Sequence, residues 1–240
     1  MPARLRVEGL AVRYGALVAL DDVSWQVDAG EILGIIGPNG AGKSSCFAAV
    51  TNSVAHDGDV FLDGERVTDV PTWDLAARGL RRTFQQNAFF GEITVLENTM
   101  GARIAEHSTG LLTSILAPWT EASNRRRAEA AATQLLTSFG IDAAYHARLP
   151  GSIPYGIQRL LSVVLAYGLG ARALLRDAPA AGTGGTDMRR LAQLLVELRA
   201  RGTAILVIEH HMDLLMSVAD RIVVIDQGRW LAEGTPAEIQ

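Results

Sequence analysis

The sequence has one cysteine, no long uninterrupted apolar run and no excess of positive charge. Because Cys46 stands alone, no intramolecular disulfide can form, and a reducing compartment is expected. The longest apolar stretch, around 160–175, is broken by Ser162, glycines and Arg172, so it does not read as a membrane span. No apolar signal segment follows Met1. We therefore expect no direct membrane insertion, and any membrane role must come through a partner.

The charge balance gives no sign of a nucleic-acid partner. Lysines and arginines number 22 against 26 acidic residues, a net charge of −4, whereas nucleic-acid-binding surfaces are basic. The 240 residues are 48% hydrophobic and 20% charged, which is typical of a soluble globular chain with a real core. We expect one domain over residues 1–240 and no nucleic acid.

The pattern of apolar residues predicts an α/β fold. Val23, Trp25 and Val27 alternate as in a strand with one buried face. A continuous apolar run, typical of a strand buried on both faces of a parallel sheet, occupies 31–37, and further strands are expected at 173–177, 203–209 and 221–226. Between them, residues 87–167 are rich in Ala, Leu, Arg and Glu. They read as a helical insert, with a helix over 125–139 and an exposed loop at 118–124.

A glycine-rich loop carries the clearest chemistry. The segment Gly37-Pro38-Asn39-Gly40-Ala41-Gly42-Lys43-Ser44 matches G-x-x-x-x-G-K-[ST] between a strand and a helix. Bare backbone N–H groups and a helix N-terminus suit polyphosphate, and Ser45 extends the same turn. Lys43 places a charge on the β- and γ-phosphates, and the Ser44 hydroxyl suits Mg²⁺. This motif alone does not separate transporters, kinases, GTPases and helicases.

Beyond this loop, the sequence resembles the ABC ATPases from about residue 5 to the end. The segment V-R-Tyr14-G-A-L-V-A-L resembles the stretch in which an aromatic side chain stacks on adenine; packing of Tyr14 on the core is the alternative. Arg82-Thr-Phe-Gln85 resembles the Q-loop, which implies a catalytic and Mg²⁺-contacting role for Gln85. Ile208-Glu-His210 resembles the switch segment, which implies that His210 donates to the γ-phosphate.

The segment 153–159 stands where the family signature L-S-G-G-Q belongs. The resemblance implies that Tyr155 and Gly156 contact the γ-phosphate held by the opposite subunit of a dimer. Pro154 replaces the signature serine, and Ile157 and Leu160 replace polar positions. The Pro-Tyr-Gly variant resembles the ATPases of branched-chain amino-acid importers, and an ABC ATPase for some other solute is the alternative.

The Walker B segment departs from the family pattern. Asp177 is present to hold Mg²⁺, but Ala178 stands where active members have a glutamate that polarises the attacking water. Arg176 also puts a charge in a strand that should be apolar. We expect MgATP binding with slow hydrolysis, for which Glu209 is a weak candidate as substitute base.

The resemblance implies a RecA-like P-loop NTPase core at 1–86 and 168–240, with an antiparallel β subdomain, and a helical subdomain at 87–167. It also implies ATP and Mg²⁺ as cofactors. The implied partners are integral-membrane permease subunits and a second ATPase subunit, in a homo- or heterodimer. The expected location is cytoplasmic, on the inner face of the plasma membrane. There are two alternatives: a non-transport ABC protein of repair or translation, and a regulatory nucleotide binder.

Overall fold

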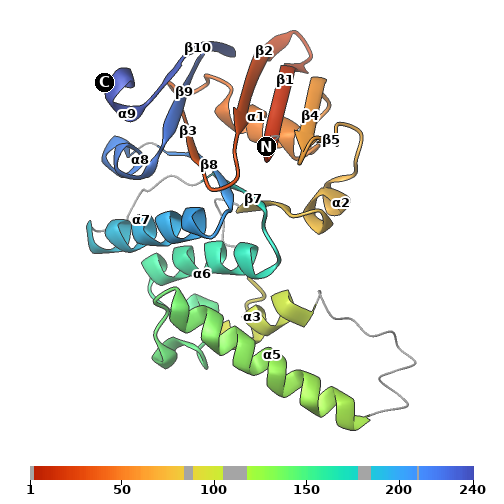
Figure 1. Ribbon diagram of the computed structural model, residues 1–240, viewed down its shortest axis with the longest axis vertical. Helices are drawn as coiled ribbons and strands as arrows, with labels where there is room; N and C mark the ends of the chain where they lie inside the picture. The colour runs from red at the N-terminus through yellow and green to blue at the C-terminus, as the bar shows by residue number, and fades with distance from the viewer. Residues whose placement is uncertain (1–2, 84–88, 105–117, 178–184, 210) are drawn as a thin grey trace. The chain divides into compact units, whose positions relative to one another are not determined.

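The structure is a computed structural model that describes residues 3–83, 89–104, 118–177, 185–209 and 211–240 (Figure 1). The chain divides into two compact units. One comprises Met1–Gln85 with Ala171–Gln240, and the other comprises Gln86–Gly170.

The first unit contains a four-stranded antiparallel sheet in the order β2-β1-β4-β5. Alternate residues of its strands are buried, among them Val23, Trp25 and Val27, as the sequence pattern predicts. The strands are β1 (Leu5–Tyr14), β2 (Leu17–Val27), β4 (Asp57–Leu62) and β5 (Glu65–Arg66).

A six-stranded sheet in the order β10-β9-β3-β8-β7-β6 forms the centre of the same unit. Its pairs are parallel except for β9 with β10, which is antiparallel. Strands β3, β7 and β8 are buried along nearly their whole length, because both faces are covered. The strands are β3 (Ile32–Ile36), β6 (Leu80–Thr83), β7 (Ala173–Asp177), β8 (Ala204–Ile208), β9 (Arg221–Asp226) and β10 (Arg229–Gly234).

The main apolar cluster joins buried residues of the two sheets to helix residues, which come mainly from one helix. Phe47 and Cys46 of that helix, α1, are fully buried in the cluster with Leu33 and Val223 of the central strands and Leu10 of β1. The helices of this unit are α1 (Lys43–Val50), α2 (Thr72–Ala77), α7 (Gly185–Ala200), α8 (Met212–Val218) and α9 (Pro236–Ile239).

The second unit is helical. It contains α3 (Val95–Ile104), α5 (Pro118–Ser138), α6 (Tyr155–Gly168) and two short 3₁₀ turns at Ala143–Tyr145 and Pro150–Ser152. The expected loop at 118–124 is wrong, because α5 begins at Pro118. A proline in the first helical turn lacks only an N–H that has no partner within the helix.

The apolar residues of α6 are largely buried. Ile157 and Leu160, which replace polar positions of the signature, are 4% and 2% exposed. Phe139 and Tyr167 pack edge to face with ring centroids 5.4 Å apart. Among the described residues, no helix has both the length and the apolar character that crossing a membrane requires.

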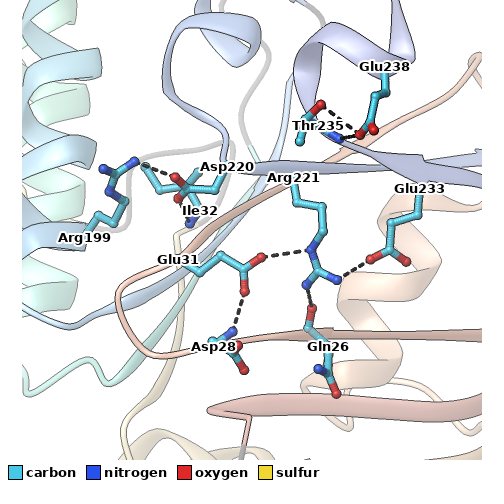
Figure 2. A network of polar contacts seen from close by, with 10 residues as sticks. All are labelled: Gln26, Asp28, Glu31, Ile32, Arg199, Asp220, Arg221, Glu233, Thr235 and Glu238. Atoms are coloured by element: carbon cyan, nitrogen blue, oxygen red, sulfur yellow. Dashed lines mark hydrogen bonds and ion pairs between the residues drawn. The ribbon is translucent and has the colours of Figure 1, made fainter.

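A polar network centred on Arg221 ties the two sheets of the first unit together (Figure 2). Arg221, on β9, donates from Nε to Oε1 of Glu31 at 3.0 Å and from Nη2 to the carbonyl of Gln26, on β2, at 2.6 Å. It also pairs with Glu233 of β10. Asp220 accepts from the backbone N–H of Ile32 at 2.9 Å and from Arg199 of α7. The network therefore fixes the entry into β3, the strand that leads to the phosphate loop.

Candidate active site

Glycine is required at two positions of the loop between β3 and α1. A Cβ on Gly37 would lie 1.9 Å from the carbonyl oxygen of Ile225. Gly42, the N-cap of α1, has φ of 100°, and a Cβ there would lie 2.3 Å from the carbonyl oxygen of Ala19. Any side chain at either position would collide with backbone, so the loop needs its glycines for steric reasons.

The turn between β9 and β10 holds the glycine-rich loop through a backbone hydrogen bond. The backbone N–H of Gly228 donates to the carbonyl of Ala41 at 3.0 Å. The carbonyl of Gly228 accepts from the N–H of Asp21, on β2, at 2.8 Å. The loop is thus held between two neighbouring elements, while Pro38, Asn39 and Gly40 remain exposed.

Lys43 is buried at the start of α1 and is the only lysine in the chain. Its Nζ donates to the carbonyl oxygens of Gly37 at 2.7 Å and of Pro38 at 2.8 Å. Burial lowers the pKa of Lys43, and the charge of Asp177 opposes this shift. The ammonium group therefore lies against the loop, within the electrostatic reach of the carboxylate.

Asp177 ends β7 and is paired with an arginine that the sequence reasoning missed. Arg82, on the neighbouring strand β6, donates from Nη2 to Oδ2 of Asp177 at 3.0 Å. Its guanidinium also lies 5.8 Å from the ring centroid of Phe47 on α1. The sequence feature that marks this contact is a basic residue near the end of the strand beside β7. It can be recognised only when the order of the strands in the sheet is known.

Arg176 forms a different ion pair, with Glu209. Its Nη1 donates to Oε1 of Glu209 at 3.2 Å, and the two side chains are 2% and 0% exposed. Since neighbouring residues of a strand point to opposite faces, this pair lies on the face away from Asp177. The pair explains how β7 holds an arginine, and it argues against Glu209 as a substitute base.

Tyr14 lies at the end of β1, beside the turn into β2, and is 47% exposed. It does not pack into the core, so the alternative interpretation of Tyr14 is wrong. The strand that follows the turn reaches the phosphate loop, because Ala19 of β2 bounds the space beside Gly42. An exposed ring on this hairpin is suited to stacking on a flat ligand.

The signature segment lies in the helical unit, at the N-terminus of α6. Tyr155 is 46% exposed, and the guanidinium of Arg159 lies 4.9 Å from its ring centroid. Gly156 is buried in the first turn of the helix. Pro154 is the N-cap and supplies no side-chain hydrogen bond to the helix.

Three residues singled out from the sequence lie outside the described residues. These are Gln85, Ala178 and His210, and the structure gives no account of their positions.

Cys46 has no route to solvent. It is fully buried in α1, and burial raises the pKa of its thiol to about 12, an effect that the neighbouring Trp25 side chain only partly opposes. Cys46 is a packing residue of the core and not a reactive thiol.

The residues around the loop fit a nucleotide polyphosphate and Mg²⁺. The loop presents exposed backbone at Asn39 and Gly40 next to the Lys43 ammonium, which together provide donors for an anion. Mg²⁺ in such sites takes one or two protein oxygens in addition to phosphate oxygens. The exposed Ser44 hydroxyl and the Asp177 carboxylate are oxygens of the right kind.

Comparison with known proteins agrees with this geometry. Residues 20–181 match the family described as ABC transporter. The chain is 37% identical to the high-affinity branched-chain amino acid transport ATP-binding protein BraF of Pseudomonas aeruginosa, over 98% of this chain and 93% of BraF. It is 38% identical to LivG, the protein of the same description from Salmonella typhimurium, with the same coverage.

Solved structures give the same result for the fold. A nucleotide-free ATP-binding cassette from an ABC transporter aligns with a TM-score of 0.82 and 28% identity, over 98% of this chain and 92% of that one. A cassette in its ADP conformation aligns equally well. The α/β fold class is thereby confirmed. The chain belongs to the ABC transporter family, as an ATP-binding subunit most similar to those of branched-chain amino-acid importers.

Proposed function

We propose that the chain binds MgATP at residues 37–45 and drives solute import by a membrane permease. The observation that carries this proposal is the position of Lys43, held by the carbonyls of Gly37 and Pro38 and close to Asp177. A buried ammonium group that donates to carbonyl oxygens can exchange them for phosphate oxygens, which are charged and bind it more strongly.

The proposed roles of the site residues follow their positions in the chain. Tyr14 stacks on adenine, and the backbone from Gly37 to Ser45 surrounds the phosphates. Ser44, Gln85 and Asp177 hold Mg²⁺, which when bound neutralises phosphate charge. Gln85 and His210 act at the γ-phosphate. Tyr155 and Gly156 complete the site of a second subunit across a dimer interface.

We further propose that ATP turnover by this chain is slow. Ala178 has no proton acceptor where the family has a glutamate, and general-base help is typically worth about 10²–10⁴ in rate. Glu209 is engaged by Arg176 in the interior and does not replace that base. Binding of phosphate does not depend on position 178, so ATP affinity is retained.

Turnover assays on the full chain test this proposal. ATP hydrolysis is measured for the wild type and for Ala178→Glu, with Ala178→Gln as a matched control that adds volume without a base. Slow hydrolysis that rises at least about 10²-fold only in the glutamate variant is expected. Fast hydrolysis by the wild type, unchanged by the glutamate, would contradict it.

Branched-chain amino acids are the proposed solutes, because BraF and LivG are described as transporting them and both proteins match nearly the whole of this chain. The proposed partners are permease subunits and a second ATPase subunit, in a homo- or heterodimer, at the cytoplasmic face of the plasma membrane. Co-purification with a polytopic membrane protein and ATP-dependent leucine uptake by the reconstituted complex test this assignment. Uptake of another solute class, without leucine uptake, would overturn it.

A regulatory nucleotide binder is the second candidate, and Ala178 is the feature that favours it. The two candidates differ in one respect. A transport subunit supports uptake that is lost with Lys43→Ala, whereas a regulatory subunit changes the rate of uptake driven by another ATPase. Measuring uptake by a complex that contains the Lys43→Ala chain and an intact partner ATPase separates the two candidates.

A further inference from the structure

The carboxylate of Asp177 already has a cationic partner supplied by the chain. Arg82 donates to its Oδ2 at 3.0 Å, and the two side chains are 17% and 7% exposed. In such partly buried surroundings a charge-assisted hydrogen bond is stronger than it is at the surface. The pair is therefore a fixed part of the site.

Packing holds Arg82 in this place independently of the ion pair. Its strand β6 pairs with β7 in parallel register, with Arg82 opposite Leu175. The guanidinium lies 5.8 Å from the ring of Phe47, which is fully buried in α1. A cation near an aromatic face is attracted to it, so Arg82 is held between α1 and the end of β7.

The described charges at this end of the loop include two cations and one anion that interact with one another. Lys43 and Arg82 are the cations, and Asp177 is the anion. The buried pair of Arg176 with Glu209 is balanced and lies on the other face of β7. Without a metal ion, an unpaired carboxylate here would repel a polyphosphate, but one neutralised by a guanidinium repels it much less.

We propose that Arg82 is an internal counter-ion of Asp177 that makes nucleotide binding by this chain only weakly dependent on Mg²⁺. Two effects act in the same direction. Arg82 removes the repulsion that metal-free nucleotide would meet, and it competes with the metal for the same carboxylate. This inference rests on the proposed function, because it assumes that nucleotide binds at the 37–45 loop.

The test is calorimetric titration of the full chain with a non-hydrolysable ATP analogue, once with excess Mg²⁺ and once with EDTA. The measured quantity is the ratio of Kd in EDTA to Kd in Mg²⁺. For the wild type we expect a ratio below about tenfold, where tenfold corresponds to ~1.4 kcal/mol. For Arg82→Gln we expect the ratio to rise by at least about tenfold, mainly through weaker binding in EDTA.

Three further variants make the outcome specific. Arg82→Met keeps an apolar stem beside Phe47 and is expected to behave like Arg82→Gln, while Arg82→Lys should keep most of the wild-type ratio. Arg172→Gln, which removes an exposed ion pair with Asp63, is the control and should leave the ratio unchanged.

The possible failures are distinguishable. If the wild type binds the analogue in neither condition, the proposed function fails. If it binds and the ratio is the same in the wild type, Arg82→Gln and Arg82→Met, the proposed role of Arg82 is wrong.

Discussion

Among single substitutions, we expect loss of the ion pair of Arg176 with Glu209 to lower the free energy of unfolding strongly. Both side chains lie in the interior, so removal of one partner leaves the other charge there without this contact. We expect Arg176→Leu to lower the free energy of unfolding by about 3–5 kcal/mol. Urea denaturation followed by far-UV circular dichroism measures this change.

The double variant Arg176→Leu with Glu209→Leu is the control for this prediction. It replaces both charges with apolar side chains, which is often neutral or stabilising in a protein interior. We expect its stability to return to within about 1 kcal/mol of the wild type. A double variant as unstable as Arg176→Leu would show that the pair does not explain the effect.

Cys46 gives a second prediction at the residue scale. Because burial raises its pKa to about 12, the native thiol should not react with an aromatic disulfide reagent at pH 8, and unfolding should release one reactive thiol per chain. The folded pKa lies above the ordinary value of 9.0, so this group favours unfolding increasingly as pH rises from 9.0 toward about 12.

The pH effect is isolated by comparison with Cys46→Ala. The stability difference between wild type and variant should be constant below pH 8 and should shrink as the pH is raised above 9.0. Complete labelling of the native wild type within minutes at pH 8 would contradict the buried position.

The sequence predicted the contiguous part of the candidate site, and the reason is physical. The loop from Gly37 to Ser44 is dictated by local sterics and by the strand and helix that flank it, so its pattern is visible in one segment. The contact of Arg82 with Asp177 joins residues far apart in the chain and depends on β6 lying beside β7. Likewise, the close approach of the Ile225 carbonyl to Gly37, which leaves no room for a side chain there, follows only from the tertiary fold.

Among the elements, β9 has the most consequential polar contacts. Arg221 bonds to Glu31, Glu233 and the carbonyl of Gln26, and so joins β9 to β10 and to the other sheet. Its side chain is 29% exposed, which reduces but does not remove the strength of these bonds. We expect Arg221→Gln to lower the free energy of unfolding by about 1–3 kcal/mol, measured by urea denaturation.

Arg229→Gln is the matched control for the Arg221 variant. Arg229 also joins β10 to β2, through Asp21, but its side chain is 73% exposed. An exposed pair is typically worth about 0.2–1 kcal/mol, so this variant should be the milder of the two. Equal losses from both variants would contradict the role assigned to the Arg221 network.

The buried elements were predicted better from the sequence than the exposed ones. Strands β3, β7, β8 and β9 are apolar runs and lie within a residue or two of their expected positions. The start of α5 was missed because Pro118 and the polar residues after it resemble a turn in sequence. Strand β10 was not expected, because it lies at a sheet edge, where the apolar signal is weak.

For the whole molecule, the alternation of apolar runs with helices sufficed for the α/β class. Strand order did not follow from the sequence, since β6 and β7 are neighbours in the sheet although the whole helical unit separates them in the chain. That order brings Lys43, Asp177 and Arg82 to one end of the sheet. Carboxyl ends of strands in open α/β sheets are where ligands bind.

The central claim is that the backbone around Lys43 binds the polyphosphate of a nucleotide. Calorimetric titration with MgATP, combined with thermal unfolding, tests it most directly in the wild type and in Lys43→Ala. We predict saturable heat and, at about 100 times Kd, a stabilisation of about 2.7 kcal/mol for the wild type, with both effects lost in Lys43→Ala. A folded wild type that gives neither heat nor protection, or a Lys43→Ala variant that binds equally well, would contradict the claim.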